Sequence, residues 1–278
     1  MLSVIKALME SVDLAVYSYV KPGAPHRFSP YFKDLHSFIL TFTSALDAYA
    51  ACAEAGFSVA EGRVGFTSLK IGDLLKDTLR YSSRRLGSRN APEFHVVMVP
   101  TVVASAYALR LGSKNFIEGF RKGLSDTLLF NDVSETVKAY ESLRAYGGRY
   151  SSIIEGLMLT PTKIKLESVS IHDLYTEIGR EDLVLNYFTG KLSTLISASS
   201  TFVSTYLKRG DANKAAVIAY GKLVEDLLNI RLLNYLEKSS FTDLLKLDKE
   251  LHSRRTSLQY VTPLLCVAIF LGLLMIQH

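Results

Sequence analysis

The sequence has very little cysteine. Cys52 and Cys266 are the two cysteines in 278 residues, and they lie far apart without the spacing of metal ligands. Both fall in apolar stretches with a helical pattern, so we expect two buried thiols rather than a disulfide. This excludes a disulfide-stapled scaffold and a cysteine-based zinc site, and it favours a reducing, cytoplasmic location.

The sequence also lacks several common functional motifs. It has no phosphate-binding Gly-rich loop ending in Lys-Ser or Lys-Thr, no dinucleotide fingerprint and no Gly-x-Ser-x-Gly elbow. Its histidines lack zinc spacing. No repeat of fixed period and no series of evenly spaced short strands is present. The usual signatures of nucleotide hydrolases, dehydrogenases and serine hydrolases are therefore missing.

Neither end of the chain reads as a membrane segment. Glu10 and Asp13 interrupt the apolar N-terminus, and no small-residue cleavage site follows, so we do not expect a signal peptide. Val261 to Ile276 is uncharged, but it is shorter than the roughly 20 residues that a membrane span needs. Pro263 also lies near its start. We therefore expect a buried terminal helix and no membrane partner.

Composition favours an ordered chain with anionic partners. Hydrophobic residues make up 48% and charged residues 21%, which is enough for a sizeable core and argues against disorder. The net charge of +5 favours anionic partners but does not separate nucleic acid from ATP or CoA. The densest basic run is Arg80, Arg84, Arg85 and Arg89. A solvated helix face explains this run better than a nucleic-acid surface.

Helical periodicity runs through most of the chain. Apolar residues at three- and four-residue steps predict helices over Leu35 to Tyr49, Val133 to Leu143, Glu181 to Leu207 and Asn213 to Leu236. Plausible N-caps are Ser3, Asp34, Asp132 and Asp211, and plausible helix stops are Gly56, Gly87, Gly112 and Gly147. His95 to Val99 has strand-like composition, but we expect a helix with a kink at Pro100. A single all-α domain over residues 1–278, a globular multi-helix bundle, is the predicted fold.

One loop near the N-terminus concentrates cationic and proton-handling groups. The segment Lys-Pro-Gly-Ala-Pro-His-Arg spans residues 21–27, so Lys21, His26 and Arg27 lie within seven residues. Two prolines stiffen the loop, and Gly23 allows close approach of a ligand to the backbone. Such a rigid turn suits phosphate oxygens, although a solvated interhelical turn is the plain alternative.

Three blocks of this sequence resemble the triphosphoribosyl-dephospho-CoA synthase family in its archaeal form. In the first, the fitting positions are Lys21, Pro22, Gly23, His26, Arg27, Asp34, Phe38, Ser44 and Ala45, while Ala24 stands where the family prefers Asn. In the second they are Asp132, Val133, Tyr140, Glu141, Arg144, Gly147 and Gly148. In the third they are Arg180, Asp182, Leu183 and Tyr187. The blocks keep the family's order along most of the chain.

Two family motifs are altered. The family's Asn-Thr-x-Leu-Gly stands here as Asn-Ala-Pro-Glu-Phe-His over residues 90–95, and its late Asn-Pro-Gly-Thr-Thr-Ala-Asp as Arg-Arg-Thr-Ser-Leu-Gln-Tyr over residues 254–260. The first change introduces Glu93 and the second introduces Arg254 and Arg255. One hypothesis is that these changes are coupled through an ion pair between Glu93 and either arginine.

The resemblance implies transfer of a triphosphoribosyl group from ATP, as substrate, to 3′-dephospho-CoA with release of adenine, usually with Mg²⁺. The residues it places at the nucleotide are Lys21, Gly23, His26, Arg27, Asp132, Arg144, Gly147 and Gly148. The residues it places at the reacting ribose are Asp34, Glu141 and Asp182. Carboxylates there would orient hydroxyls, hold metal or accept a proton.

Each of these carboxylates also has a structural explanation. Asp34 and Asp132 precede helices and suit N-caps. Glu141 and Arg144 are three residues apart on one helix and suit a surface ion pair. Asp182 has Glu181 as its neighbour, and only one of the two can face inward on a helix. We expect Asp182 to do so because the resemblance places an Asp there.

The functional hypotheses therefore remain three. The first is a triphosphoribosyl transferase acting on ATP and a dephospho-CoA-type acceptor. The second is a non-catalytic nucleotide or CoA binder, which the altered motifs motivate. The third and least favoured is a basic helical nucleic-acid binder. The sequence leaves open the acceptor, the metal and the oligomeric state, a homodimer included.

Overall fold

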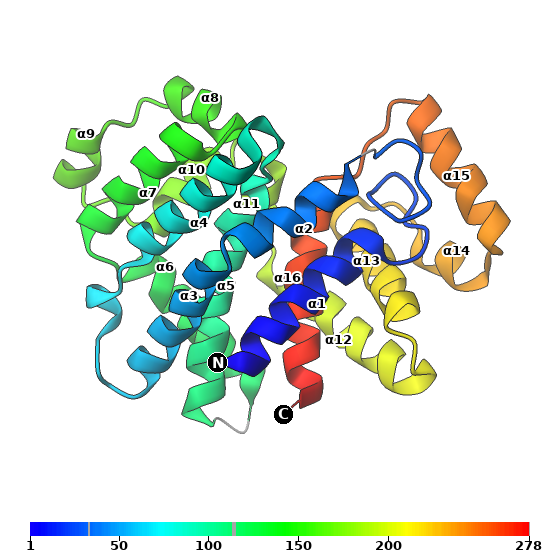
Figure 1. The fold of residues 1–278 in the computed structure, drawn as a ribbon, viewed down its shortest axis with the longest axis horizontal. Coiled ribbons are helices and arrows are strands. Elements are labelled where there is room, and N and C mark those ends of the chain that lie inside the picture. Colours follow the sequence, from blue (N-terminus) through cyan, green and yellow to red (C-terminus); the bar gives the residue numbers. More distant parts are fainter. Residues whose placement is uncertain (33, 113–114, 278) are drawn as a thin grey trace. The chain divides into compact units, whose positions relative to one another are not determined.

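The chain folds almost entirely into helices. The structure is a computed structural model that describes residues 1–32, 34–112 and 115–277. Over these residues it contains α-helices and two short 3-10 helices, and no strand. This confirms the predicted all-α class (Figure 1). The strand-like segment at His95 is part of a long helix, because its β-branched side chains are buried all round.

The contacts within the chain form two compact units. Unit 1 comprises residues 1–6 and 40–189, and unit 2 comprises residues 7–39 and 190–278. Helices α1 (Leu2–Tyr17) and α2 (Leu35–Ser44) each have residues in both. The single-domain organisation stays a prediction.

Unit 1 is built around α5. Its α-helices are α3 (Leu46–Ala60), α4 (Ile71–Leu86), α5 (Pro92–Leu111), α6 (Phe116–Leu129), α7 (Val133–Tyr146), α8 (Arg149–Gly156), α9 (Pro161–Leu166), α10 (Ile171–Ile178) and α11 (Leu183–Gly190). The 3-10 helices are η1 (Phe66–Ser68) and η2 (Gly87–Arg89). Helix α5 packs against α3, α4 and α6. It contains Pro100 and is buried from Phe94 to Ala108.

Helix α5 is long and apolar enough to cross a membrane by length and composition, but 83% of its apolar window is buried inside the structure. A helix that is apolar all round is also typical of the core of a soluble bundle. Gly56 explains how closely its neighbour approaches, since a Cβ there would lie 2.2 Å from the carbonyl oxygen of Val103. Gly56 therefore lies inside α3 for packing, and the prediction that it ends a helix is wrong.

Unit 2 is built around the C-terminal helix. Its helices after α1 and α2 are α12 (Leu192–Arg209), α13 (Ala212–Leu228), α14 (Leu233–Lys238), α15 (Phe241–Ser253) and α16 (Val261–Gln277). Helix α16, red in Figure 1, packs against α12 and α13 and is buried from Val261 to Leu274. The terminal apolar segment is thus a core helix, as the length rule predicts. Cys52 and Cys266 are free and buried.

Helix boundaries follow capping chemistry more closely than apolar periodicity. Asp132 and Asp211 are N-caps whose carboxylates accept from main-chain N–H groups, and Gly87, Gly112 and Gly147 end helices as predicted. Ser3 lies inside α1, so it is not a cap. The predicted helix over Glu181 to Leu207 is two helices that break at Lys191. The predicted helices over Leu35 to Tyr49 and Asn213 to Leu236 are also interrupted, at Ala45 and at Asn229.

Candidate functional site

The cationic loop after α1 is buried in unit 2. Residues 21–26 are all shielded from solvent. Lys21 is completely buried, and its Nζ donates to Ser18 Oγ at 2.8 Å. Burial lowers the pKa of Lys21 well below its ordinary value, and the nearby charge of Arg27 lowers it further. Lys21 therefore has no exposed ammonium to offer a phosphate in this conformation.

The organising residue of the loop is Asp248 on α15. Its Oδ1 accepts from the Gly23 N–H at 2.8 Å, and its Oδ2 lies 3.3 Å from His26 Nε2. His26 Nδ1 accepts from the Phe28 N–H at 3.2 Å, so in a neutral ring the proton is on Nε2, facing Asp248. Burial lowers the pKa of His26, although Asp248 opposes that shift. Asp248 was not among the predicted residues, because nothing in its helical surroundings distinguishes it from a surface carboxylate.

The backbone of Gly23 lies close to other side chains of the protein, where the sequence predicted close approach of a ligand. Its φ of 81° requires glycine, and a Cβ there would lie 3.2 Å from Leu251 Cδ1 and 3.3 Å from Leu258 Cγ. The Leu258 N–H donates to the Gly23 carbonyl at 2.7 Å, and the Tyr220 hydroxyl donates to the Pro22 carbonyl at 2.6 Å. The altered motif over residues 254–260 therefore covers the loop with leucine.

Arg27 is the exposed cation of the loop. Its Nε donates to the Tyr17 carbonyl at 2.6 Å, and its Nη2 donates to Asn213 Oδ1 at 2.9 Å. The guanidinium also lies 5.7 Å from the ring centroid of Tyr19. Asp34 is exposed, and its Oδ1 accepts from the Ser37 N–H at 3.3 Å in the first turn of α2. This bond is of the N-capping type, as the capping interpretation of Asp34 predicts.

A pocket of about 470 Å³ opens beside the leucine cover in unit 2. Its apolar wall consists of Ile230, Leu232, Leu247, Leu251 and Leu258. Its polar residues are Arg231, Tyr235, Lys246, Glu250 and Thr256. An apolar surface with a few convergent polar groups is the usual composition of a small-molecule site. Thr256 and Leu258 belong to the altered late motif, so that motif lines this pocket.

One predicted residue of unit 1, Asp182, has a set of polar partners within that unit. Asp182 is buried, and it forms an ion pair with Arg149 and accepts from the Tyr150 hydroxyl at 3.2 Å and the Leu185 N–H at 2.9 Å. Glu181 is exposed, so Asp182 is the inward neighbour, as predicted. It precedes α11 rather than lying within a helix, and its bond to Leu185 is of the N-capping type.

Glu93 of the other altered motif belongs to the same neighbourhood. Burial raises the pKa of Glu93, while the charge of Arg149 lowers it and that of Asp182 raises it. Its electrostatic partners thus lie within unit 1, whereas Arg254 and Arg255 belong to unit 2. Nothing in these contacts supports the hypothesis of coupled replacement.

The two glycines of the second block shape a helix junction. Gly147 ends α7, and its N–H donates to the Leu143 carbonyl at 2.9 Å. Gly148 precedes α8 with a φ of 55°, a value that favours glycine. Asn90 Nδ2 donates to the Tyr146 carbonyl at 3.2 Å, so a residue of the altered motif is hydrogen-bonded to the end of α7. The Gly147 amide is therefore occupied and does not face an anion.

The remaining predicted residues lie on the exposed side of α7. Asp132, Glu141 and Arg144 are exposed. Asp132 Oδ1 accepts from the Ser134 N–H at 2.7 Å, and this bonding lowers the pKa of Asp132. The structural explanation of Asp132 as an N-cap is therefore confirmed. The predicted residues fall into two sets: Lys21 to Asp34 belong to unit 2, and Asp132 to Asp182 belong to unit 1.

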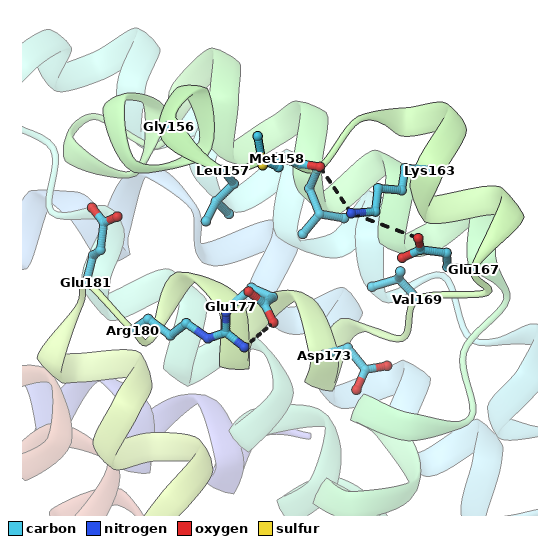
Figure 2. A pocket seen from close by; sticks show the side chains of 11 residues that line it. Gly156, Leu157, Met158, Lys163, Glu167, Val169, Asp173, Glu177, Arg180 and Glu181 are labelled. Carbon is cyan, nitrogen blue, oxygen red and sulfur yellow. Dashed lines mark hydrogen bonds and ion pairs between the residues drawn. The ribbon is translucent and has the colours of Figure 1, made fainter.

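Unit 1 also contains a larger pocket, of about 710 Å³, that sequence reasoning missed. Figure 2 shows its lining from the segment after α8, from α9 and from α10. The carboxylates of Glu167, Asp173, Glu177 and Glu181 outnumber the cations of Lys163 and Arg180. Arg180 pairs with Glu177 at 2.8 Å, and Lys163 lies 3.9 Å from Glu167. This excess of negative charge makes the pocket a poor site for a polyphosphate.

No group of three His, Cys, Asp or Glu side chains among the described residues could hold a metal ion. The described residues therefore do not fit a resident Mg²⁺ site, and Mg²⁺ stays an expectation from the resemblance. Mg²⁺ commonly arrives with substrate phosphates. Comparison with known proteins finds no matching family model, no matching curated protein and no matching solved structure.

Proposed function

We propose that this chain binds a nucleotide- or CoA-type ligand in the pocket of unit 2, without transferring a triphosphoribosyl group. The observation that carries this proposal is the composition of that pocket beside the signature loop. Arg231 and Lys246 supply positive charge for phosphate, and Tyr235 and the leucines supply apolar surface for a base or a pantetheine-like chain.

The burial of the signature loop supports binding without transfer. Transfer would need Lys21 and His26 to reach phosphate oxygens or the reacting ribose. Both side chains have no exposed surface, and Leu251 and Leu258 pack against Gly23 between them. Burial also lowers the pKa of both groups, which favours their uncharged forms. An uncharged, enclosed lysine contributes little to a triphosphate site.

Calorimetric titration with ATP and with 3′-dephospho-CoA tests the binding, and chromatography of the reaction mixture for adenine tests the transfer. We expect binding of at least one ligand and no adenine above that of a heat-denatured sample. Arg231→Ala and Lys246→Ala should each weaken binding by about tenfold, because charge-assisted hydrogen bonds are worth about 1.5–3 kcal/mol. Lys249→Ala is the matched control, since Lys249 is exposed on the same helix and does not line the pocket. Failure of both ligands to bind would contradict the proposal.

The transferase is the second candidate, and one contact favours it. The signature loop and the late motif still meet through the bond from Leu258 to Gly23. If this chain catalyses transfer, adenine will be released in proportion to the acceptor. Arg27→Ala should then abolish release while leaving the thermal midpoint nearly unchanged, because Arg27 is exposed. Adenine release that is insensitive to Arg27 would place the activity elsewhere.

A further inference from the structure

A second pocket in unit 1 has the opposite charge to the one in Figure 2. It has a volume of about 460 Å³ and lies between the C-terminal part of α2 and that of α4. The lining residues are Leu40, Thr43, Ser44, Tyr81, Arg84 and Arg85. Two guanidiniums and three hydroxyls thus share one pocket, and none of the described residues that line it carries a carboxylate.

The two arginines that line this pocket are not used elsewhere. Among the residues that the structure describes, Arg84 and Arg85 have no ion-pair or hydrogen-bond partner, whereas Arg80 one turn earlier donates to Asp77 at 2.8 Å. Both arginines lie in the last turn of α4, where a positive charge interacts favourably with the partial negative charge of the helix C-terminus. This position does not explain why both side chains line a hollow that also contains Tyr81.

The hydroxyls of the pocket differ in what they can donate. Thr43 Oγ1 donates to the Leu40 carbonyl at 3.3 Å, and Ser44 Oγ donates to the Thr41 carbonyl at 3.0 Å. Tyr81 differs because its oxygen receives a long contact of 3.5 Å from Arg80 Nη2, which leaves its own proton available. The donors that can point at a ligand are therefore the two guanidiniums and the Tyr81 hydroxyl.

We propose that this pocket binds a small molecule through a phosphate or diphosphate group. Planar guanidinium forks match pairs of phosphate oxygens, and a phenol adds one neutral donor. The absence of carboxylates from the lining removes the repulsion that the acidic pocket of unit 1 would impose. The site is independent of the nucleotide pocket proposed in unit 2, because all its residues belong to unit 1.

Calorimetric titration with inorganic pyrophosphate at low salt tests this site. The variant Arg231→Ala/Lys246→Ala serves as the background, so that the unit 2 pocket does not contribute. We expect binding in that background, and Arg84→Ala and Arg85→Ala should each weaken it by about tenfold. Arg84→Lys and Arg85→Lys should each bind pyrophosphate with intermediate affinity, because lysine keeps the positive charge but lacks the planar pair of donors. Arg121→Ala is the matched control, since Arg121 is exposed in the same unit and does not line the pocket.

Three results would overturn the proposal. The first is no binding of pyrophosphate in this background. The second is equal weakening by Arg84→Ala and Arg121→Ala, which would indicate general attraction by net charge. The third is strongly salt-dependent binding of DNA that needs Arg84 and Arg85 when pyrophosphate does not bind, which would indicate a nucleic-acid surface. Thermal midpoints of all variants should stay unchanged, because both arginines are exposed.

Discussion

Each unit contains one altered motif, and each motif contacts a loop that fits the family pattern. In unit 2 the altered motif spans residues 254–260, and in unit 1 it spans residues 90–95. In unit 2 the residue of the altered motif that meets the loop is apolar: Leu258 packs on Gly23 and its N–H donates to the Gly23 carbonyl. In unit 1 the altered motif contributes a carboxylate, Glu93, which interacts electrostatically with Arg149 and Asp182. In unit 2 the polar groups Lys21 and His26 are fully buried. In unit 1 the ion pair with Asp182 includes a half-exposed arginine, Arg149.

This difference teaches that loss of a motif does not have one structural consequence. A buried polar cluster must satisfy its own donors and acceptors, because water cannot reach them. A half-exposed side chain such as that of Arg149 can exchange its partner for water at small cost. We therefore expect removal of Asp248 in unit 2 to cost more stability than removal of Arg149 in unit 1. Two predictions test this contrast directly, and two others concern a buried leucine in unit 2 and a buried histidine in unit 1.

The largest effect should come from Asp248→Ala. This change removes the acceptor for the Gly23 N–H and the carboxylate that faces His26 Nε2, and both groups are buried. We expect a loss of about 3–5 kcal/mol in the free energy of unfolding, as for other buried partners left unpaired. Chemical denaturation measures it. Asp248→Asn is the control, since its amide oxygen can still accept from Gly23; equal losses in both variants would show that charge, and not the bond to Gly23, dominates.

Leu258→Ala should have the next largest effect. Leu258 is 4% exposed, and truncation of a buried leucine costs about 2–5 kcal/mol. The same change opens the cover over the loop, so reaction of Lys21 with an acylating reagent, followed by mass spectrometry, should increase. Leu166→Ala is the control, because Leu166 is 81% exposed in unit 1. Unchanged labelling of Lys21 would show that Leu258 does not enclose it.

An acid-dependent loss of stability should come from His95 in unit 1. Burial lowers the pKa of His95 to about 3 from an ordinary value of 6.5, and Tyr49 is its hydrogen-bonding partner at 2.8 Å. Between these pH values His95 carries a proton in the unfolded chain and none in the folded chain. The free energy of unfolding therefore has its full value above pH 6.5 and decreases as the pH falls below 6.5. The loss at pH 5 should be about 2 kcal/mol. Denaturation at pH 7 and pH 5 measures it, and His95→Gln should flatten the dependence.

The smallest effect should come from Arg149→Ala. The Arg149 side chain is 47% exposed, and Asp182 keeps its bonds to Tyr150 and Leu185 when the guanidinium is removed. We expect a loss of about 1 kcal/mol or less in the free energy of unfolding. Arg144→Ala is the control and should change stability by less than about 0.5 kcal/mol. If Arg149→Ala lowered the free energy of unfolding as much as Asp248→Ala does, the expected difference between the two regions would be wrong.

The sequence by itself determined the helical class, the buried terminal helix and several caps. These features depend on local periodicity, on the length of an apolar run and on short-range bonds such as Asp132 to Ser134. Such properties are set within a few residues of chain.

Only the tertiary structure decided which polar groups meet and which reach solvent. Asp248 lies 225 residues from Gly23, and no local pattern marks it as the acceptor of that loop. The same cationic segment could have faced a ligand or the core, and Leu251 and Leu258 decided this by packing on Gly23. Burial depends on distant segments that cover a residue. It sets the pKa and the solvent exposure of Lys21 and His26, and neither property follows from the spacing of these residues in the sequence.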